Sequence, residues 1–194
     1  MIKNTIKIAL VGQPNVGKSM LINSISNARL KVGNFSGVTV SKEQVFFDYK
    51  NFHIEIVDLP GAYSLNDYTI EEKVTKDFLN NEKYDIILNV LDSTNLQRNL
   101  LLTAELLTLD KKMIIALNMS DEAEKESILI DEIQLSKILG KPCIKTSAAK
   151  KNGITKLLDE ILLKFQSQKV PSKFFFSNVI EEENENISKV LEEN

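Results

Sequence analysis

The segment Gly12–Ser19 carries the most specific chemical pattern in this chain, because its residues GQPNVGKS match G-x-x-x-x-G-K-[ST]. Glycines let a backbone curl so that successive N–H groups point at a phosphate at the start of a helix. Lys18 brings a mobile positive charge to the β- and γ-phosphates of a nucleotide, and Ser19 offers a hydroxyl to Mg²⁺. The pattern predicts a phosphate-binding loop made of Gly12, Gln13, Pro14, Asn15, Val16, Gly17, Lys18 and Ser19.

A second candidate lies at Asp58–Gly61, where the residues DLPG directly follow the strand-like stretch HIEIV. An acidic side chain at the carboxyl end of a strand in an open α/β sheet lies where ligands bind. We expect Asp58 to hold Mg²⁺ through a water molecule. We expect the N–H of Gly61 to reach a γ-phosphate, because glycine has no side chain to block the approach. The position of DLPG after a phosphate loop favours this interpretation over a plain turn.

The segment Asn118–Asp121 reads NMSD and follows a predicted buried strand. An Asn and an Asp at this spacing can recognise guanine: the carboxylate accepts from the ring N–H and the exocyclic amine, and the amide contacts the far edge of the ring. Adenine offers Asp121 no matching donors. We include Met119, which lies between them, in the candidate base site. The triplet TSA follows the last predicted strand, where Ser147 and Ala148 would let backbone N–H groups approach the guanine oxygen.

Thr39 lies in the segment Arg29–Ser41, which we predict to be a loop because it is dotted with Gly, Ser and Asn. A loop threonine between the phosphate loop and Asp58 can supply a second hydroxyl to Mg²⁺. It can also sense the γ-phosphate through its backbone. The predicted Mg²⁺ ligands are therefore Ser19, Thr39 and, through water, Asp58.

These candidates lie at the ends of alternating strand-like and helix-like stretches. Strands are predicted at 6–11, 44–49, 52–57, 84–91, 112–117 and 142–146, and helices at 17–26, 70–78, 96–109, 131–140 and 154–165. The turn at Lys50-Asn51 is short enough to force an antiparallel hairpin, whereas the remaining alternation predicts parallel strands joined by helices. The expected fold is α/β of the P-loop NTPase class, with a mostly parallel six-stranded sheet, one antiparallel edge strand and helices on both faces.

The composition is typical of a globular domain in a reducing compartment. Of the 194 residues 43% are apolar, which is enough to form a buried core without disulfide or metal cross-links. The net charge of −3 does not suggest a nucleic-acid partner, and the single cysteine, Cys143, excludes an internal disulfide and a multi-cysteine metal site. No apolar run approaches the ~18 residues of a membrane span. We expect residues 1–166 to form a nucleotide-binding domain and 167–194 a linker and the truncated start of a C-terminal helical segment.

In their order, these motifs resemble those of the translation-factor-related GTPases, and the segments between them resemble the FeoB family of prokaryotic ferrous-iron transporters. VGNFSGVTVSKEQV resembles the first switch of that family, and DLPGAYSLNDYTIEEKVTKDFL resembles the second. The resemblance covers residues 5–165 and implies a cytosolic GTP-binding domain that binds GTP or GDP with Mg²⁺ at the inner face of the cell membrane. In that family a small helical domain and a membrane permease follow, so this chain is a fragment or the permease lies elsewhere.

The resemblance also implies a slow GTPase. Ras-like enzymes orient the attacking water with a glutamine at a position that is Ala62 here, so the remaining catalysis is electrostatic. The candidate catalytic residues are Lys18, Thr39, Gly61 and Asn15. Related potassium-activated GTPases bind a monovalent cation through an asparagine at the position of Asn15, and we expect potassium here, with backbone carbonyls of the loop 32–38 as further ligands. The alternative is that Asn15 only braces the loop.

Three functions remain open at this point. The leading one is a GTP-hydrolysing switch domain coupled to ferrous-iron uptake. A second is a soluble GTPase of the ribosome-assembly type. Such a protein would need a basic RNA-binding segment, and the acidic C-terminus argues against one. The third is a nucleotide-gated binding module in which GTP occupancy matters and turnover does not.

Overall fold

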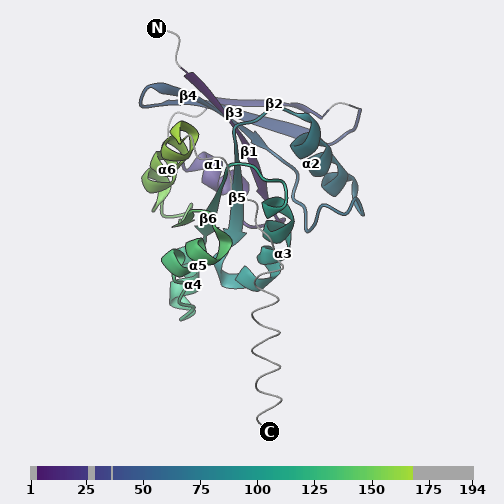
Figure 1. The fold of residues 1–194 in the computed structure, drawn as a ribbon. Coiled ribbons are helices and arrows are strands. Elements are labelled where there is room, and N and C mark those ends of the chain that lie inside the picture. The colour runs from purple at the N-terminus through teal and green to yellow at the C-terminus, as the bar shows by residue number, and fades with distance from the viewer. Residues whose placement is uncertain (1–3, 26–28, 36, 168–194) are drawn as a thin grey trace.

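A computed structural model describes residues 4–25, 29–35 and 37–167, and within these ranges strands and helices alternate around one sheet (Figure 1). The strands are β1 (Asn4–Gly12), β2 (Arg29–Asn34), β3 (Ser41–Tyr49), β4 (Phe52–Asp58), β5 (Ile86–Asp92), β6 (Met113–Asn118) and β7 (Cys143–Lys145). The helices are α1 (Lys18–Asn23), α2 (Ile70–Asn81), the 3₁₀ helix η1 (Ser93–Asn95), α3 (Leu96–Leu107), α4 (Ser120–Lys125), α5 (Glu132–Leu139) and α6 (Ile154–Gln166).

The sheet has the strand order β2-β3-β4-β1-β5-β6-β7. The central strand β1 pairs in parallel with β4 and β5, and β6 and β7 continue in the same direction. Strand β3 pairs antiparallel with β4 across the predicted hairpin, in which Tyr49 lies opposite Phe52. The α/β prediction is therefore confirmed: the sheet is mostly parallel, has an antiparallel edge and carries helices.

The sheet has 7 strands instead of the six predicted, because residues 29–34 form β2 where we predicted a loop. This strand pairs antiparallel with β3, from Arg29 opposite Phe46 to Asn34 opposite Ser41. All of its residues are exposed, so the sequence lacks the pattern of buried apolar residues that would predict a strand. The only hint is the alternation of charged and apolar residues in RLKV, which is too short to separate a strand from a loop.

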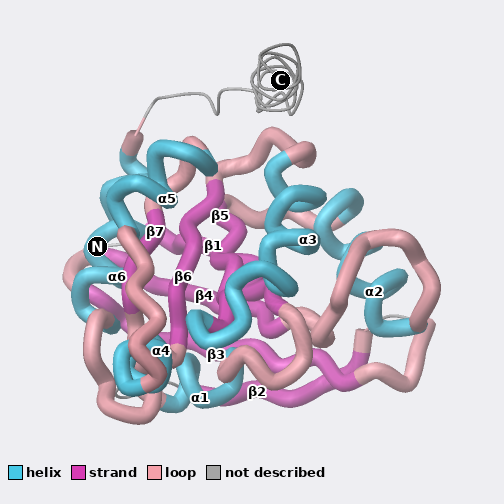
Figure 2. The backbone as a smooth tube through the Cα atoms, turned by 90° about the horizontal axis from the view of Figure 1, so that it is seen from below, coloured by secondary structure: helices cyan, strands magenta, loops and turns pink. Residues whose placement is uncertain are grey.

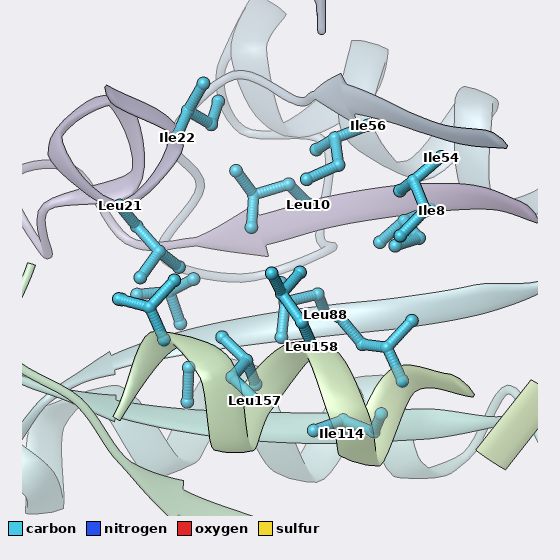
Figure 3. Packing of buried hydrophobic residues seen from close by; sticks show 14 of the residues in the cluster. Ile8, Leu10, Leu21, Ile22, Ile54, Ile56, Leu88, Ile114, Leu157 and Leu158 are labelled. Atoms are coloured by element: carbon cyan, nitrogen blue, oxygen red, sulfur yellow. The ribbon is translucent and has the colours of Figure 1, made fainter. Parts of the chain in front are cut away.

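Two clusters of buried apolar side chains form the core. The backbone view shows helices on both sides of the sheet (Figure 2). Helices α1 and α6 cover one face, where Leu157 and Leu158 of α6 pack with Leu21 of α1 against the strands (Figure 3). Helices α2 and α3 cover the other face through Phe78 and Leu102, with α5 at its margin. Because both faces are covered, β1, β5 and β6 read as nearly continuous apolar runs.

Local capping chemistry explains where α5 begins and ends. The side chain of Asp131 accepts hydrogen bonds from the N–H groups of Ile133 and Gln134 at 2.9 and 3.0 Å, as the sequence predicts, and Gly140 is the C-cap.

Cys143 lies in the core, and burial raises the pKa of its thiol to about 11. Helix α4, which the sequence analysis did not predict, follows β6 directly.

No helix within the described ranges is both long and apolar enough to cross a bilayer. Helix α6 ends at Gln166. The predicted acidic helical segment after the linker lies outside the described residues.

The packing of α6 predicts that two of its aliphatic residues contribute very differently to the free energy of unfolding. Ile161 is completely buried against the sheet, whereas Leu163 is 62% exposed. Ile161→Ala should lower the free energy of unfolding by about 2–5 kcal/mol, because it removes buried methyl groups and leaves a cavity. Leu163→Ala is the matched control and should change stability by less than about 0.5 kcal/mol. Urea unfolding of both variants measures the difference, and equal losses would contradict this packing of α6.

Candidate functional site

The segment between β1 and α1 forms a tight loop whose shape depends on its contacts with the rest of the site. Asn15 and Gly17 both adopt left-handed backbone conformations, with φ of 66° and 88°. A Cβ atom on Gly17 would lie 2.4 Å from Nδ2 of Asn118, so glycine is required here both by φ and by space. The predicted phosphate loop thus lies at the carboxyl end of β1, directly before a helix N-terminus, as phosphate binding requires.

Lys18 and Asp58 meet in a partly buried environment beside this loop. Their side chains lie 4.0 Å apart, from Nζ to Oδ1, and only 11% and 12% of them is exposed. Burial raises the pKa of Asp58 to about 6, an effect that the charge of Lys18 opposes and that of Glu43 strengthens. Burial likewise lowers the pKa of Lys18 against the attraction of Asp58. Both charges are therefore poorly solvated and would gain from a polar ligand.

One atom of this pair lacks any hydrogen bond. The buried Oδ1 of Asp58 has no hydrogen-bond partner among the described residues. Buried carboxylate oxygens are normally satisfied, and a lone pair left free in a cleft suits a cation or a cation-bound water. The donor set therefore fits a hard divalent ion.

Gly61 brings the DLPG segment onto the phosphate loop. A Cβ atom on Gly61 would lie 3.0 Å from Cα of Pro14, so any larger residue would push the two segments apart. The N–H of Ala62 donates to the carbonyl of Gly12 at 3.3 Å. A hollow of ≈ 420 Å³ opens beside this contact, lined by Pro14, Asn15, Lys18, Gly61, Tyr63, Thr69, Glu71 and Glu72.

The side chain of Asn118 connects three loops that are distant in sequence. Its Nδ2 donates to the carbonyl of Val16 at 2.9 Å, and its Oδ1 accepts from the N–H of Ala148 at 3.1 Å and from the hydroxyl of Thr146 at 3.4 Å. The residue is only 1% exposed. Its amide is thus engaged within the protein, so Asn118 positions the neighbouring loops in addition to any contact with a base.

Asp121 and Ser147 lie together at the same edge of the sheet. A hydrogen bond from the Ser147 side chain, assisted by Lys150, lowers the pKa of the Asp121 carboxyl. Lys150 Nζ lies 3.2 Å from Asp121 Oδ2. The carboxylate is therefore ionised at neutral pH and ready to accept hydrogen bonds. Met119, in a left-handed conformation with φ of 57°, directs the chain from β6 into α4.

Thr39 and Ser19 are both exposed. Thr39 does not line the hollow that contains Lys18 and Gly61. It lines a neighbouring hollow of ≈ 410 Å³, together with Val40, Ser41, Pro60, Ile70 and Glu71. The 32–38 segment, which we expected to supply loop carbonyls, lies in β2 up to Asn34. The prediction of a loop is therefore wrong for residues 29–34, because pairing with β3 makes them a strand, whereas the expectation that carbonyls of 32–38 bind potassium stays a prediction.

One residue that the sequence analysis did not single out, Glu72, holds the segment after Gly61. Glu72 is 4% exposed and accepts from the N–H of Ser64 at 3.1 Å and from the N–H of Tyr68 at 3.2 Å. The sequence did contain a signal, since Thr69 and Glu72 are spaced as a capping box and Thr69 Oγ1 does accept from the N–H of Glu72. Gln13, within the predicted phosphate loop, donates through Nε2 to the carbonyl of Arg98 at 2.8 Å.

The structure brings most of the predicted site to one edge of the sheet. The phosphate loop follows β1, Asp58 ends β4, Asn118 ends β6 and Ser147 follows β7, and all four of these strands are parallel. Such an arrangement defines a G domain of the P-loop NTPase class. The chain belongs to the family of ferrous iron transport protein B, whose family model matches residues 6–161.

Two curated relatives show how much of a longer protein this chain represents. The Fe(2+) transporter FeoB of Campylobacter jejuni is 53% identical over 176 residues, which cover 91% of this chain and 29% of the relative. The Fe(2+) transporter FeoB of Helicobacter pylori is 58% identical over 180 residues, which cover 88% of this chain and 28% of the relative. The chain therefore spans less than a third of the length of these relatives.

Solved structures of the same family resemble the fold closely. The cytosolic domain of the T. maritima FeoB iron transporter in a GDP form has a TM-score of 0.86 and 37% identity, covering 89% of this chain and 68% of that chain. The FeoB G-domain from Methanococcus jannaschii has a TM-score of 0.74 and 39% identity, covering 84% of this chain and 99% of that chain.

The hydrogen bonds of Asn118 predict a loss of stability that is independent of nucleotide. Asn118→Ala leaves the carbonyl of Val16 and the N–H of Ala148 without their partner, which should cost about 1–3 kcal/mol. Asn23→Ala, a change of an exposed asparagine on α1, should stay within about 0.5 kcal/mol of the unaltered chain. Urea unfolding without nucleotide measures both, and an unchanged Asn118→Ala midpoint would show that the amide does not brace the loops.

Proposed function

We propose that this chain is a GTP-hydrolysing switch domain whose nucleotide state is coupled to ferrous-iron uptake. The observation that carries the proposal is the Lys18–Asp58 pair beside the phosphate loop, in which the buried Asp58 Oδ1 lies 4.0 Å from Lys18 Nζ and accepts no hydrogen bond from the described residues. Charges buried in this way are costly unless a phosphate and a cation complete the site. Membership in the family of ferrous iron transport protein B supplies the link to iron.

The base site is suited to guanine. The ionised carboxylate of Asp121 can accept from the ring N–H and the exocyclic amine, and adenine presents no such pair of donors. Ser147 and Ala148 lie in the loop that Asn118 holds in place, and their N–H groups donate to the carbonyl of Asn152 and to Oδ1 of Asn118. The T. maritima relative has been solved in GDP and GMPPNP forms, which supports a guanine nucleotide here.

Ser19, Thr39 and Asp58 would hold Mg²⁺, with Asp58 acting through water. All three present oxygen donors, which this ion prefers, and Asp58 Oδ1 is free to accept. When bound, the ion would neutralise charge on the β- and γ-phosphates. Thr39 would contribute from the hollow that it shares with Pro60.

Hydrolysis proceeds by in-line attack of water on the γ-phosphate in this proposal. Lys18 and the N–H of Gly61 stabilise charge on the transferring group, because both lie at the hollow beside the phosphate loop. Ala62 has no side chain that could orient the water, so the intrinsic rate should be slow. Loss of the γ-phosphate would release the segments around Thr39 and Gly61, which is the switch.

Asn15 is the candidate potassium ligand. It is exposed, has a left-handed backbone conformation with φ of 66°, and lines the hollow that contains Lys18 and Gly61. Its amide oxygen therefore fits a monovalent cation beside the γ-phosphate. When bound, that cation would counter charge on the transferring phosphoryl group, as an arginine finger does.

The other two functions are less well supported. Family membership favours iron transport over ribosome assembly. A nucleotide-gated binding module would differ from the proposed GTPase only in lacking multiple turnover.

We propose that residues 1–166 form the GTP-binding domain, with the linker and helical segment following. The permease would lie in the parts of the longer relatives that this chain does not cover. The domain would then act at the cytoplasmic face of the membrane, in line with the relatives solved as cytosolic domains.

The base site predicts a defined change in nucleotide preference. Asp121→Asn should weaken GTP binding by about 10- to 100-fold, since it removes charged hydrogen bonds. The same variant should gain affinity for xanthosine triphosphate, because its amide can donate to an oxygen where guanine has an amine. Competition titrations with GTP, ATP and xanthosine triphosphate measure this, alongside multiple-turnover phosphate release. ATP competing as well as GTP would refute guanine selectivity, and GTP binding without turnover would favour the binding module.

The proposed cation site predicts salt-dependent turnover. GTP hydrolysis should be at least about tenfold faster in potassium than in a bulky organic cation at matched ionic strength, with sodium in between. Asn15→Ala should remove most of this stimulation because the ion loses a side-chain ligand. Phosphate release in the three salts measures it for both proteins. Equal rates of the unaltered chain in all salts would refute the site, and stimulation that survives Asn15→Ala would leave Asn15 only a bracing role.

A further inference from the structure

Helix α3 carries two charged side chains that both contact the segment after Gly61. Arg98 and Glu105 are seven residues apart, close to two helical turns, so they lie on the same face of α3. That face is directed at residues 63–66, which belong to no helix or strand. A segment without backbone pairing of its own depends on such side chains for its position.

Arg98 links this segment to the phosphate loop. Its guanidinium carbon lies 4.7 Å from the centroid of the Tyr63 ring, which is a cation–π contact. Its backbone carbonyl accepts from Nε2 of Gln13 at 2.8 Å, and the side chain of Gln13 belongs to a residue that is only 4% exposed. Tyr63 in turn lines the hollow that contains Lys18. Arg98 therefore contacts both Tyr63, after Gly61, and Gln13 of the phosphate loop.

Glu105 holds Leu65 and Asn66 of the same segment. Its Oε2 accepts from the N–H of Leu65 at 2.5 Å, and its Oε1 accepts from Nδ2 of Asn66 at 3.3 Å. Hydrogen bonds to a charged acceptor are stronger than neutral ones. Glu105 therefore fixes the far end of the segment whose near end Arg98 contacts.

We propose that Arg98 and Glu105 are positioning residues for hydrolysis, acting as a clamp from α3 on residues 63–66. Because Ala62 offers no side chain to orient water, the backbone at 61–62 has to be placed accurately beside the phosphate loop. Among the described residues, the 3.3 Å hydrogen bond from Ala62 to Gly12, the close approach of Gly61 to Pro14 and the burial of Ala62 hold this backbone directly. The clamp restrains the residues that follow and thereby keeps Gly61 on the loop. This inference rests on the proposed GTPase function.

The test compares Arg98→Ala, Arg98→Lys and Glu105→Ala with Gln97→Ala, an exposed position on the same helix. Hydrogen exchange of the Ala62 amide, without nucleotide, is the decisive readout, because neither clamp residue bonds to that amide. Exchange should accelerate about threefold in Arg98→Ala, the size of an exposed cation–π contact, and about tenfold in Glu105→Ala, the size of a charge-assisted hydrogen bond. Arg98→Lys should restore part of the protection, and Gln97→Ala should not differ from the unaltered chain.

Kinetics supply the second readout. In the two alanine variants kcat for GTP should fall by factors similar to the gains in exchange, while the Kd for GDP should stay within about twofold, because neither residue contacts the base or the phosphate loop through its side chain. Unchanged exchange at Ala62 in both alanine variants would overturn the clamp. So would an equal loss in Gln97→Ala, which would indicate a general effect on α3. If the unaltered chain does not hydrolyse GTP, the proposed function fails, and the exchange measurement still decides whether the clamp exists.

Discussion

The buried amide of Asn118 holds together three of the segments from which the nucleotide site is built: its own, the phosphate loop and the loop after β7. Its donor reaches the carbonyl of Val16 and its acceptor receives the N–H of Ala148, so the phosphate loop and the loop after β7 meet at one side chain. A buried amide without these partners would cost free energy. Gly17 completes the constraint, because no larger residue fits against the same amide. The same side chain therefore braces the folded domain and sets the relative position of the loops of the site.

The parallel sheet determines where this constraint can act. Strands β1, β4, β6 and β7 all end at the same edge, so the loops that follow them converge although they are far apart in the sequence. The apolar layers on both faces then exclude water from the base of the site. That exclusion leaves Lys18 and Asp58 poorly solvated, which shifts the pKa of each toward its neutral form. The scaffold thus maintains an unfavourable pair of charges directly beside the phosphate loop.

The two sides of the site are built differently. Around Asn118 the contacts are buried and run between side chains and backbone. Around Gly61 the chain has no regular pairing, and long side chains from neighbouring helices hold it: Glu72 from α2, and Arg98 and Glu105 from α3. Exposed segments held by a few side chains open at lower free energy than paired core strands. The Asn118 side of the site is therefore held by more buried contacts than the segment after Gly61.

The sequence by itself determined the parts that depend on local chemistry. The glycine spacing of the phosphate loop, the cap at Asp131 and the apolar runs of β1, β5 and β6 each follow from neighbouring residues, and the structure has the predicted elements at these places. The sequence also indicated that Asp58 and Asn118 would lie at one edge, because both follow strands. Only the tertiary structure decided that 29–34 is a strand, since β2 buries neither face and owes its form to pairing with β3.

The tertiary structure likewise decided the partners of the site residues. Asn118 and Val16 are 102 positions apart, and Gln13 and Arg98 are 85 apart. The residue types at these positions are common in turns and on helix surfaces, so nothing local marks them as partners. They meet because packing of helices on both faces of a twisted sheet sets which loops and helix ends touch, and this is a property of the whole fold that no short stretch of sequence encodes.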